Sequence, residues 1–117
     1  MTTHPAKHNF YVYRGATFSE QIEWKDESGT PVNLTGFTAR MHMRETLEAA
    51  DPFLTLTTEN GGITLGGVAG TIQLLASATQ TTVITAISGV YDLELVSGAN
   101  VTRLLEGLVI ISPEVTR

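Results

Sequence analysis

The heptapeptide Phe37-Thr38-Ala39-Arg40-Met41-His42-Met43 alternates strictly between apolar and polar side chains. Successive side chains of a β-strand point to opposite faces, so this alternation places one face in a core and the other in solvent. A helix would scatter the same apolar positions around its circumference. Residues 37–43 therefore predict a half-buried strand.

A second alternating stretch lies near the C-terminus. Within residues 90–96 the apolar side chains are predicted to point inward and the acids outward, namely Tyr91, Leu93 and Leu95 against Asp92 and Glu94. Residues 97–100 supply a hairpin loop, after which residues 101–111 are predicted to return antiparallel. Pro113 has no N–H to donate to a ladder, so the last strand is predicted to end before it.

Shorter apolar runs between turn residues predict the other strands. They cover residues 10–12, 17–24, 53–57, 63–65 and 71–75, with Gly, Asn, Asp and Pro concentrated in the turns. In the second run Phe18, Ile22 and Trp24 share a face. Glu20 falls on that same face and interrupts the alternation.

Residues 77–87 carry mixed signals. Ser77 with Gln80 resembles a capping box, and three apolar residues would share one helical face, namely Val83, Ile84 and Ile87. The β-branched and short polar residues of this segment weaken a helix. We predict a single short helix that bridges two strands.

Together these segments amount to about seven to nine short strands with turns roughly every 8–12 residues, the spacing typical of a sandwich. Without a sustained amphipathic helix, a sheet can hide its apolar face only against another sheet. The sequence thus predicts an all-β antiparallel β-sandwich. At 117 residues the chain suits one domain, with residues 1–9 as a flexible N-terminal arm and residues 10–117 as the sandwich.

Charge narrows the range of partners. Seven Lys and Arg against twelve Asp and Glu give a net charge of -5. Nucleic acid and anionic membrane are not expected as partners, because both need a clustered positive patch. The N-terminus lacks the apolar region of a signal peptide, and the longest uncharged apolar run, residues 108–111, is too short to span a bilayer. We expect synthesis and folding in a cytoplasm.

Residue types that carry out chemistry are present without the spacing that the chemistry needs. The absence of cysteine excludes disulfides, thiolate nucleophiles and cysteine-ligated zinc. His4 and His8 lie four apart, but in a Pro-containing arm without a helix signal. Asp92 and Glu94 share one strand face, which is interpreted as its solvent side. We therefore predict no catalytic residue, no metal site and no cofactor, and no enzymatic activity.

Aromatic residues near the N-terminus form the candidate interface. Tyr11 and Tyr13 lie out of phase with Phe10 and Val12 and are expected to be exposed, whereas Trp24 is expected in the core. We predict Phe10, Tyr11 and Tyr13 as an interface patch, because aromatic side chains contribute large contact areas. Exposed tyrosines can also stack on sugars, so a carbohydrate-binding module that recognises host-surface glycan is the alternative.

Five motifs occur in an order that resembles a known family. They are Tyr13-Arg14-Gly15-Ala16-Thr17-Phe18, Ile22-Glu23-Trp24-Lys25-Asp26, Pro31-Val32-Asn33-Leu34-Thr35-Gly36-Phe37-Thr38-Ala39-Arg40-Met41, Gly89-Val90-Tyr91-Asp92-Leu93-Glu94-Leu95 and Leu104-Leu105-Glu106-Gly107-Leu108-Val109-Ile110. Over most of residues 10–116 the chain resembles small phage and prophage virion proteins, including the N-terminal domain of baseplate-upper-protein-type tail components. The resemblance implies an immunoglobulin-like β-sandwich used as a docking module, with no catalytic residue to carry over.

The resemblance and the residues together predict a non-enzymatic structural component of a tailed-bacteriophage virion. Attachment domains of the family usually continue into a long fibre, whereas this chain ends at Arg117. That difference favours a connector at the tail, neck or baseplate, or a capsid decoration protein. The expected partners are other virion proteins, with several copies forming a homo-oligomer on the particle. We expect the protein in the virion, after synthesis in the host cytoplasm.

Overall fold

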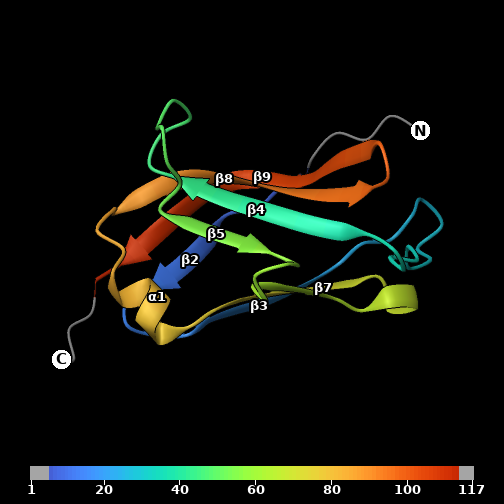
Figure 1. Cartoon of the computed structure of the whole chain (residues 1–117), viewed down its shortest axis with the longest axis horizontal. Coiled ribbons are helices and arrows are strands. Elements are labelled where there is room, and N and C mark those ends of the chain that lie inside the picture. Colours follow the sequence, from blue (N-terminus) through green and yellow to red (C-terminus); the bar gives the residue numbers. More distant parts are fainter. Residues whose placement is uncertain (1–5, 114–117) are drawn as a thin grey trace.

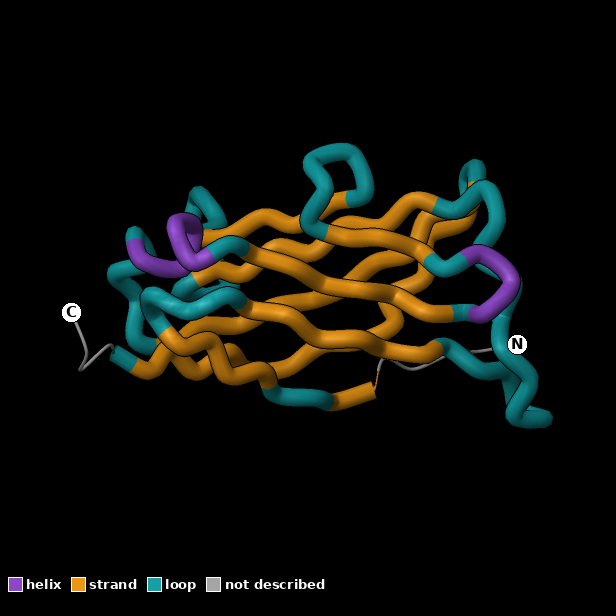
Figure 2. The backbone as a smooth tube through the Cα atoms, turned by 90° about the horizontal axis from the view of Figure 1, so that it is seen from below, coloured by secondary structure: helices purple, strands orange, loops and turns teal. Residues whose placement is uncertain are grey.

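Two β-sheets packed face to face make up the computed structural model, which describes residues 6–113 (Figure 1). The larger sheet has six strands: β1 (Ala6–Lys7), β2 (Phe10–Tyr13), β4 (Thr38–Arg44), β5 (Leu54–Thr57), β8 (Ser88–Ser97) and β9 (Asn100–Ser112). The smaller sheet has three: β3 (Phe18–Glu23), β6 (Ile63–Leu65) and β7 (Thr71–Ala76). Two short helical segments, η1 (Gly67–Ala69) and α1 (Ala78–Thr82), lie in the connections (Figure 2).

The strand order is that of an immunoglobulin sandwich with a C′ strand and, among the described residues, no C″. The larger sheet runs β1-β9-β8-β4-β5, with β2 also paired to β9, and the smaller sheet runs β3-β7-β6. In immunoglobulin terms β3, β7 and β6 are strands B, E and D, and β9, β8, β4 and β5 are G, F, C and C′. The predicted immunoglobulin-like β-sandwich is confirmed. It is not purely antiparallel, because β1 and β2 run parallel to β9.

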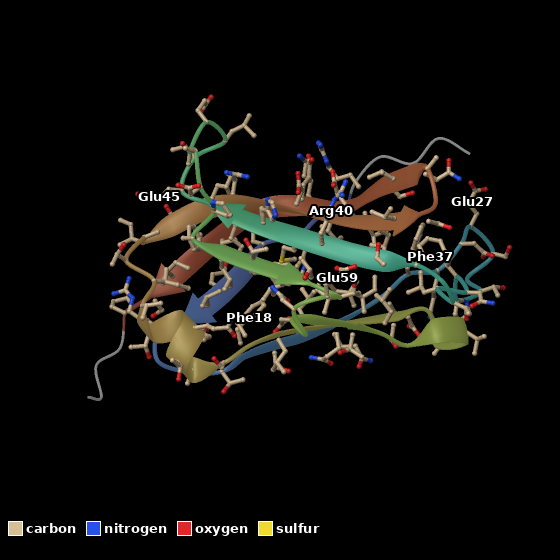
Figure 3. All side chains as sticks on the ribbon, viewed as in Figure 1. Phe18, Glu27, Phe37, Arg40, Glu45 and Glu59 are labelled. Atoms are coloured by element: carbon tan, nitrogen blue, oxygen red, sulfur yellow. The ribbon has the colours of Figure 1, made fainter. Side chains whose placement is uncertain are left out.

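Alternating side chains from both sheets fill the space between them. Ala39, Met41 and Met43 are buried on β4, as the alternation of residues 37–43 predicts. The predicted inward residues of β8 are buried as well, and the core is completed by residues such as Phe10, Val12, Phe18, Ile72, Leu74, Val109 and Ile111. Figure 3 shows Phe18 between the two sheets. Each predicted strand from residue 17 onward has a counterpart whose ends differ by at most two residues.

The predicted short helix is present, but its apolar face is not. Ser77 and Gln80 form the capping box, and α1 ends at Thr82. Ile84 is buried whereas Val83 and Ile87 are exposed, so the prediction of a shared helical face is wrong. The cause lies in the β-branched run that follows, which stops the helix after little more than one turn. Across residues 6–113 no helix is long and apolar enough to cross a bilayer.

Part of the predicted flexible arm is ordered. Residues 1–5, with His4, lie outside the described residues, but Ala6 and Lys7 form β1 beside β9. The His8 N–H donates to the Glu106 carbonyl at 3.0 Å. The prediction of flexibility therefore does not hold for residues 6–9. Their own polar composition gives no strand signal, and they pair because β9 offers them a free edge.

Candidate interaction surface

The outer face of the larger sheet carries charged side chains in rows that cross the strands. Strand register places one row across β4, β8 and β9, formed by Arg40, Glu94 and Arg103. The next row crosses β4, β8, β9 and β1, formed by His42, Asp92, Glu106 and Lys7. Figure 3 shows Arg40 on this outer side. The outward orientation predicted for Asp92 and Glu94 is therefore correct.

Arg103 is the centre of an ion-pair network between these rows. Asp92 and Glu106 lie directly opposite one another on β8 and β9, an arrangement of like charges that is unfavourable by itself. The Arg103 guanidinium lies between them, with Nε 3.5 Å from Asp92 Oδ2 and Nη1 3.7 Å from Glu106 Oε1. Its Nη2 reaches Glu94 Oε2 at 4.0 Å, and Arg40 Nε donates to Glu94 Oε1 at 2.8 Å. Each acid of the two rows thus has a cationic partner.

The N-terminal strand β1 extends this network. The Lys7 ammonium pairs with the Glu106 carboxylate across the β1–β9 register. The hydrogen bond from Lys7 lowers the pKa of Glu106 below its ordinary value of 4.5, and the charges of Lys7 and Arg103 act in the same direction. Both residues of this pair are open to solvent, so the pair fixes orientation more than it adds stability.

A buried tyrosine holds the same N-terminal segment from the core side. The Tyr91 hydroxyl donates to the His8 carbonyl at 2.6 Å, and burial raises the pKa of Tyr91, so the hydroxyl stays protonated as a donor. Gly107 lies opposite Tyr91 on β9. A Cβ at Gly107 would approach the His8 carbonyl oxygen to 2.1 Å, so only glycine lets this segment pass so close.

A shallow basin of about 700 Å³ lies over these rows. One wall is the loop between β4 and β5, which projects from the larger sheet in Figure 1 and brings Leu47 to the rim. Arg44 fixes this loop, because its Nη1 donates to the carbonyls of Ala49 and Ala50 at 2.9 and 3.1 Å. The Arg44 Nη2 also lies 3.3 Å from His42 Nδ1. The basin therefore combines the charged rows with apolar lining from residues such as Leu47, Val90 and Leu108.

An apolar flank adjoins the basin on the same face. We use this name for Tyr11, Tyr13, Leu108 and Ile110, which alternate outward on the neighbouring strands β2 and β9. Tyr11, Tyr13 and Leu108 are 58%, 60% and 49% exposed. Contiguous exposed apolar side chains mark protein contact sites more often than isolated ones do. The flank and the basin together form the candidate interaction surface.

The structure divides the predicted interface patch. Tyr11 and Tyr13 are exposed, as expected, but Phe10 is 2% exposed and packs in the core, with its ring centroid 5.6 Å from that of Phe18. The assignment of Phe10 to an interface is therefore wrong, since it shares the inward phase of Val12. Neither tyrosine lines the basin, so the two do not form an aromatic groove with it.

Among the charged rows, sequence reasoning missed Lys7, Arg103 and Glu106. Their spacing along the chain gives no signal, because they meet only through the β1–β9 and β8–β9 registers. Across residues 6–113, no group of three or more His, Asp and Glu side chains is placed to hold a metal ion. The surface thus presents exposed apolar side chains beside rows of paired charges.

Comparisons with known proteins agree with this architecture. The chain superposes on the N-terminal domain of phage TP901-1 ORF48 with a TM-score of 0.54 at 14% identity, covering 95% of this chain and 92% of that chain. A marsupial T cell receptor gives a TM-score of 0.51 at 11% identity and is covered over 51% of its length. No protein-family model and no curated protein matches the sequence. At these identities the likeness establishes a shared immunoglobulin-like fold.

Proposed function

We propose that this protein is a non-enzymatic structural component of a tailed-bacteriophage particle, where it docks onto other virion proteins. The observation that carries the proposal is the correspondence with a phage domain over nearly the full length of both chains. The T cell receptor shares the fold, but half of it has no counterpart here. The motif resemblance to small virion proteins over residues 10–116 points in the same direction.

The candidate interaction surface supports docking as the mode of action. The apolar flank supplies area that leaves water on contact, which is the main source of affinity in protein interfaces. The charged rows beside it would act as a polar rim that selects partners of complementary charge. Such a surface suits a connector at the tail, neck or baseplate, or a decoration protein on a capsid, present in several copies.

Purified particles provide the direct test. Phage particles whose genome encodes this chain would be purified, analysed by mass spectrometry and labelled with gold-conjugated antibodies for electron microscopy. We expect the chain in the particle and the label at one position. Particles that lack the chain would contradict the proposal, and a glycan array bound by the purified protein would favour the carbohydrate-binding alternative.

Surface variants would show which face docks. Leu108→Ser with Tyr13→Ser removes much of the apolar flank, and we expect reduced incorporation into particles. Gln21→Ala with Gln73→Ala is the matched control, because both glutamines lie on the smaller sheet, opposite one another on β3 and β7. Equal incorporation of both variants would exclude the apolar flank as the docking site.

A further inference from the structure

Within the described part of the chain the two sheets have four edges: one formed by β1 and β2 in succession along β9, and one each formed by β5, β3 and β6. An edge strand exposes unpaired N–H and C=O groups that can pair with another chain, and proteins usually block such edges. The four edges here differ in how they are blocked. That difference identifies the one that is open.

In the smaller sheet, the β3 edge is blocked by acidic side chains, and the β6 edge is too short to pair with a long strand. Glu20 lies opposite the buried Leu74, on the core-facing side of β3, yet its side chain is exposed. An inward-pointing charge on an edge strand is a known device against pairing, because an added strand would bury it. Glu23 adds a second acid to this edge, and β6 is only three residues long.

The β5 edge of the larger sheet is occupied by a side chain of the same protein. Asn60 Nδ2 donates to the Thr55 carbonyl at 3.0 Å, and Asn60 Oδ1 accepts from the Thr57 N–H at 2.9 Å. The ladder uses the alternate residues, since the Thr58 N–H donates to the Ala39 carbonyl. The amide of Asn60 thus takes the place that a further strand would occupy.

The β2 edge has no such block. The N–H groups of His8 and Arg14 donate to β9 at 3.0 and 2.9 Å, and a strand in a ladder alternates its bonding sides. The backbone groups of Tyr11 and the N–H of Tyr13 therefore face away from β9. Strand β2 contains no charged residue, and both tyrosine side chains are exposed beside this edge.

We propose that two copies of this chain associate through their β2 edges, pairing antiparallel about a two-fold axis at Tyr11. In that register the two Tyr11 residues exchange two backbone hydrogen bonds, and Tyr13 lies opposite Asn9 of the second copy. The two larger sheets become one continuous sheet. The inference concerns the purified chain and goes beyond the proposed function without resting on it.

Charge and continuity favour a second copy as the occupant. Two chains of net charge -5 repel one another, and an edge rich in acids such as β3 would add to that repulsion. At β2 the facing residues are uncharged, so no like charges oppose each other. The pairing also brings the two apolar flanks together, which enlarges the apolar area available for burial.

Sedimentation equilibrium and light scattering on the full chain test this directly, from about 10 µM to about 1 mM protein. We expect the mass to rise with concentration from 12.6 kDa toward twice that value. Tyr11→Pro deletes an N–H that faces the free edge and should weaken dimerisation at least about tenfold. Gln21→Pro is the matched control, because its N–H faces the free edge of β3.

Variants with opposite charges at position 11 distinguish a loss of dimerisation from a loss of folding. Tyr11→Lys and Tyr11→Glu each place like charges across the axis, so each alone should remain monomeric, whereas an equimolar mixture should dimerise. Circular dichroism would establish that both variants are folded. A mass of 12.6 kDa for the unsubstituted chain at every concentration, a dimer insensitive to all Tyr11 substitutions, or no dimer in the mixture would each overturn the proposal.

Discussion

Tyr91 joins the core to the N-terminal segment through a single hydroxyl group. Tyr91→Phe keeps the ring and removes the donor, leaving the His8 carbonyl without this partner. We expect a loss of about 1 kcal/mol in the free energy of unfolding, the usual worth of such a hydrogen bond. Urea denaturation measures it. Tyr11→Phe removes a hydroxyl from a tyrosine that is 58% exposed, and an equal loss there would contradict the expectation.

For single residues, the sequence predicts correctly which side chains point into the core. It does not predict which residues contact one another. The two-residue period was enough to assign Met41 and Leu93 to the core. Glu20 broke that period, and its reason emerges only when β3 is known to be an edge. The requirement for glycine at position 107 could not be predicted from the sequence. It arises because His8, almost 100 residues earlier in the chain, passes directly beside Gly107.

Among the elements, the β5 edge depends on Asn60. Asn60→Ala removes the contacts of the amide to Thr55, Thr57 and Gly62, and we expect it to cost about 1–2 kcal/mol in stability. Asn60→Asp keeps both acceptor contacts and should cost less. Thermal unfolding would measure both. Equal stability of Asn60→Ala and the unsubstituted protein would mean that the amide contributes nothing to this edge.

The charged rows give a pH dependence with a defined sign. The pKa of Glu106 is lower in the folded chain than its ordinary value of 4.5, so ionised Glu106 stabilises the fold above that pH. The contribution is lost as the pH falls below 4.5 through the folded pKa. We therefore expect Glu106→Gln to be less stable than the unsubstituted protein near neutral pH.

Urea denaturation across a pH series would show the Glu106→Gln difference closing below pH 4.5. Added salt should also reduce it, because the pair is exposed and screened. Glu45→Gln on the β4–β5 loop is a suitable control, since Glu45 is exposed and lies outside the rows. A difference that persisted unchanged into acid would rule out ionisation of Glu106 as its source.

Element boundaries followed from local sequence where local forces dominate. The hairpin of β8 and β9 and the capping box of α1 are determined by nearby residues, and both were predicted. The pairing of β1 with β9 joins residues nearly 100 positions apart, and no local pattern reports it. The ion-pair network could not be predicted for the same reason, since strand register determines which charged side chains meet.

For the whole molecule, both sheets share one core, so damage to it should unfold them together. Met41 is 1% exposed at the centre of the larger sheet and belongs to a core cluster contributed by both sheets. We expect Met41→Ala to cost roughly 2–5 kcal/mol through lost burial and a residual cavity. Calorimetry should still show one transition at a lower temperature. Two resolved transitions would mean that the sheets unfold separately.

At this scale the sequence predicted the architecture but not the surface. Alternation and turn spacing suffice for a sandwich, because an apolar sheet face must be covered. The basin needs the β4–β5 loop to be held by Arg44, and the apolar flank needs β2 to lie beside β9. Both depend on tertiary contacts that follow only once the strands are assembled.

The parallel alignment of β2 with β9 also determines how the molecule resists mechanical unfolding under a pulling force. Pulling the chain by its two ends would draw β2 and β9 past one another along their length. Their hydrogen bonds would then resist in shear and have to break together, whereas a hairpin opened from one end unzips bond by bond. Strands β2 and β9 thus act as a mechanical clamp, which would let one copy transmit force along a chain of connected proteins.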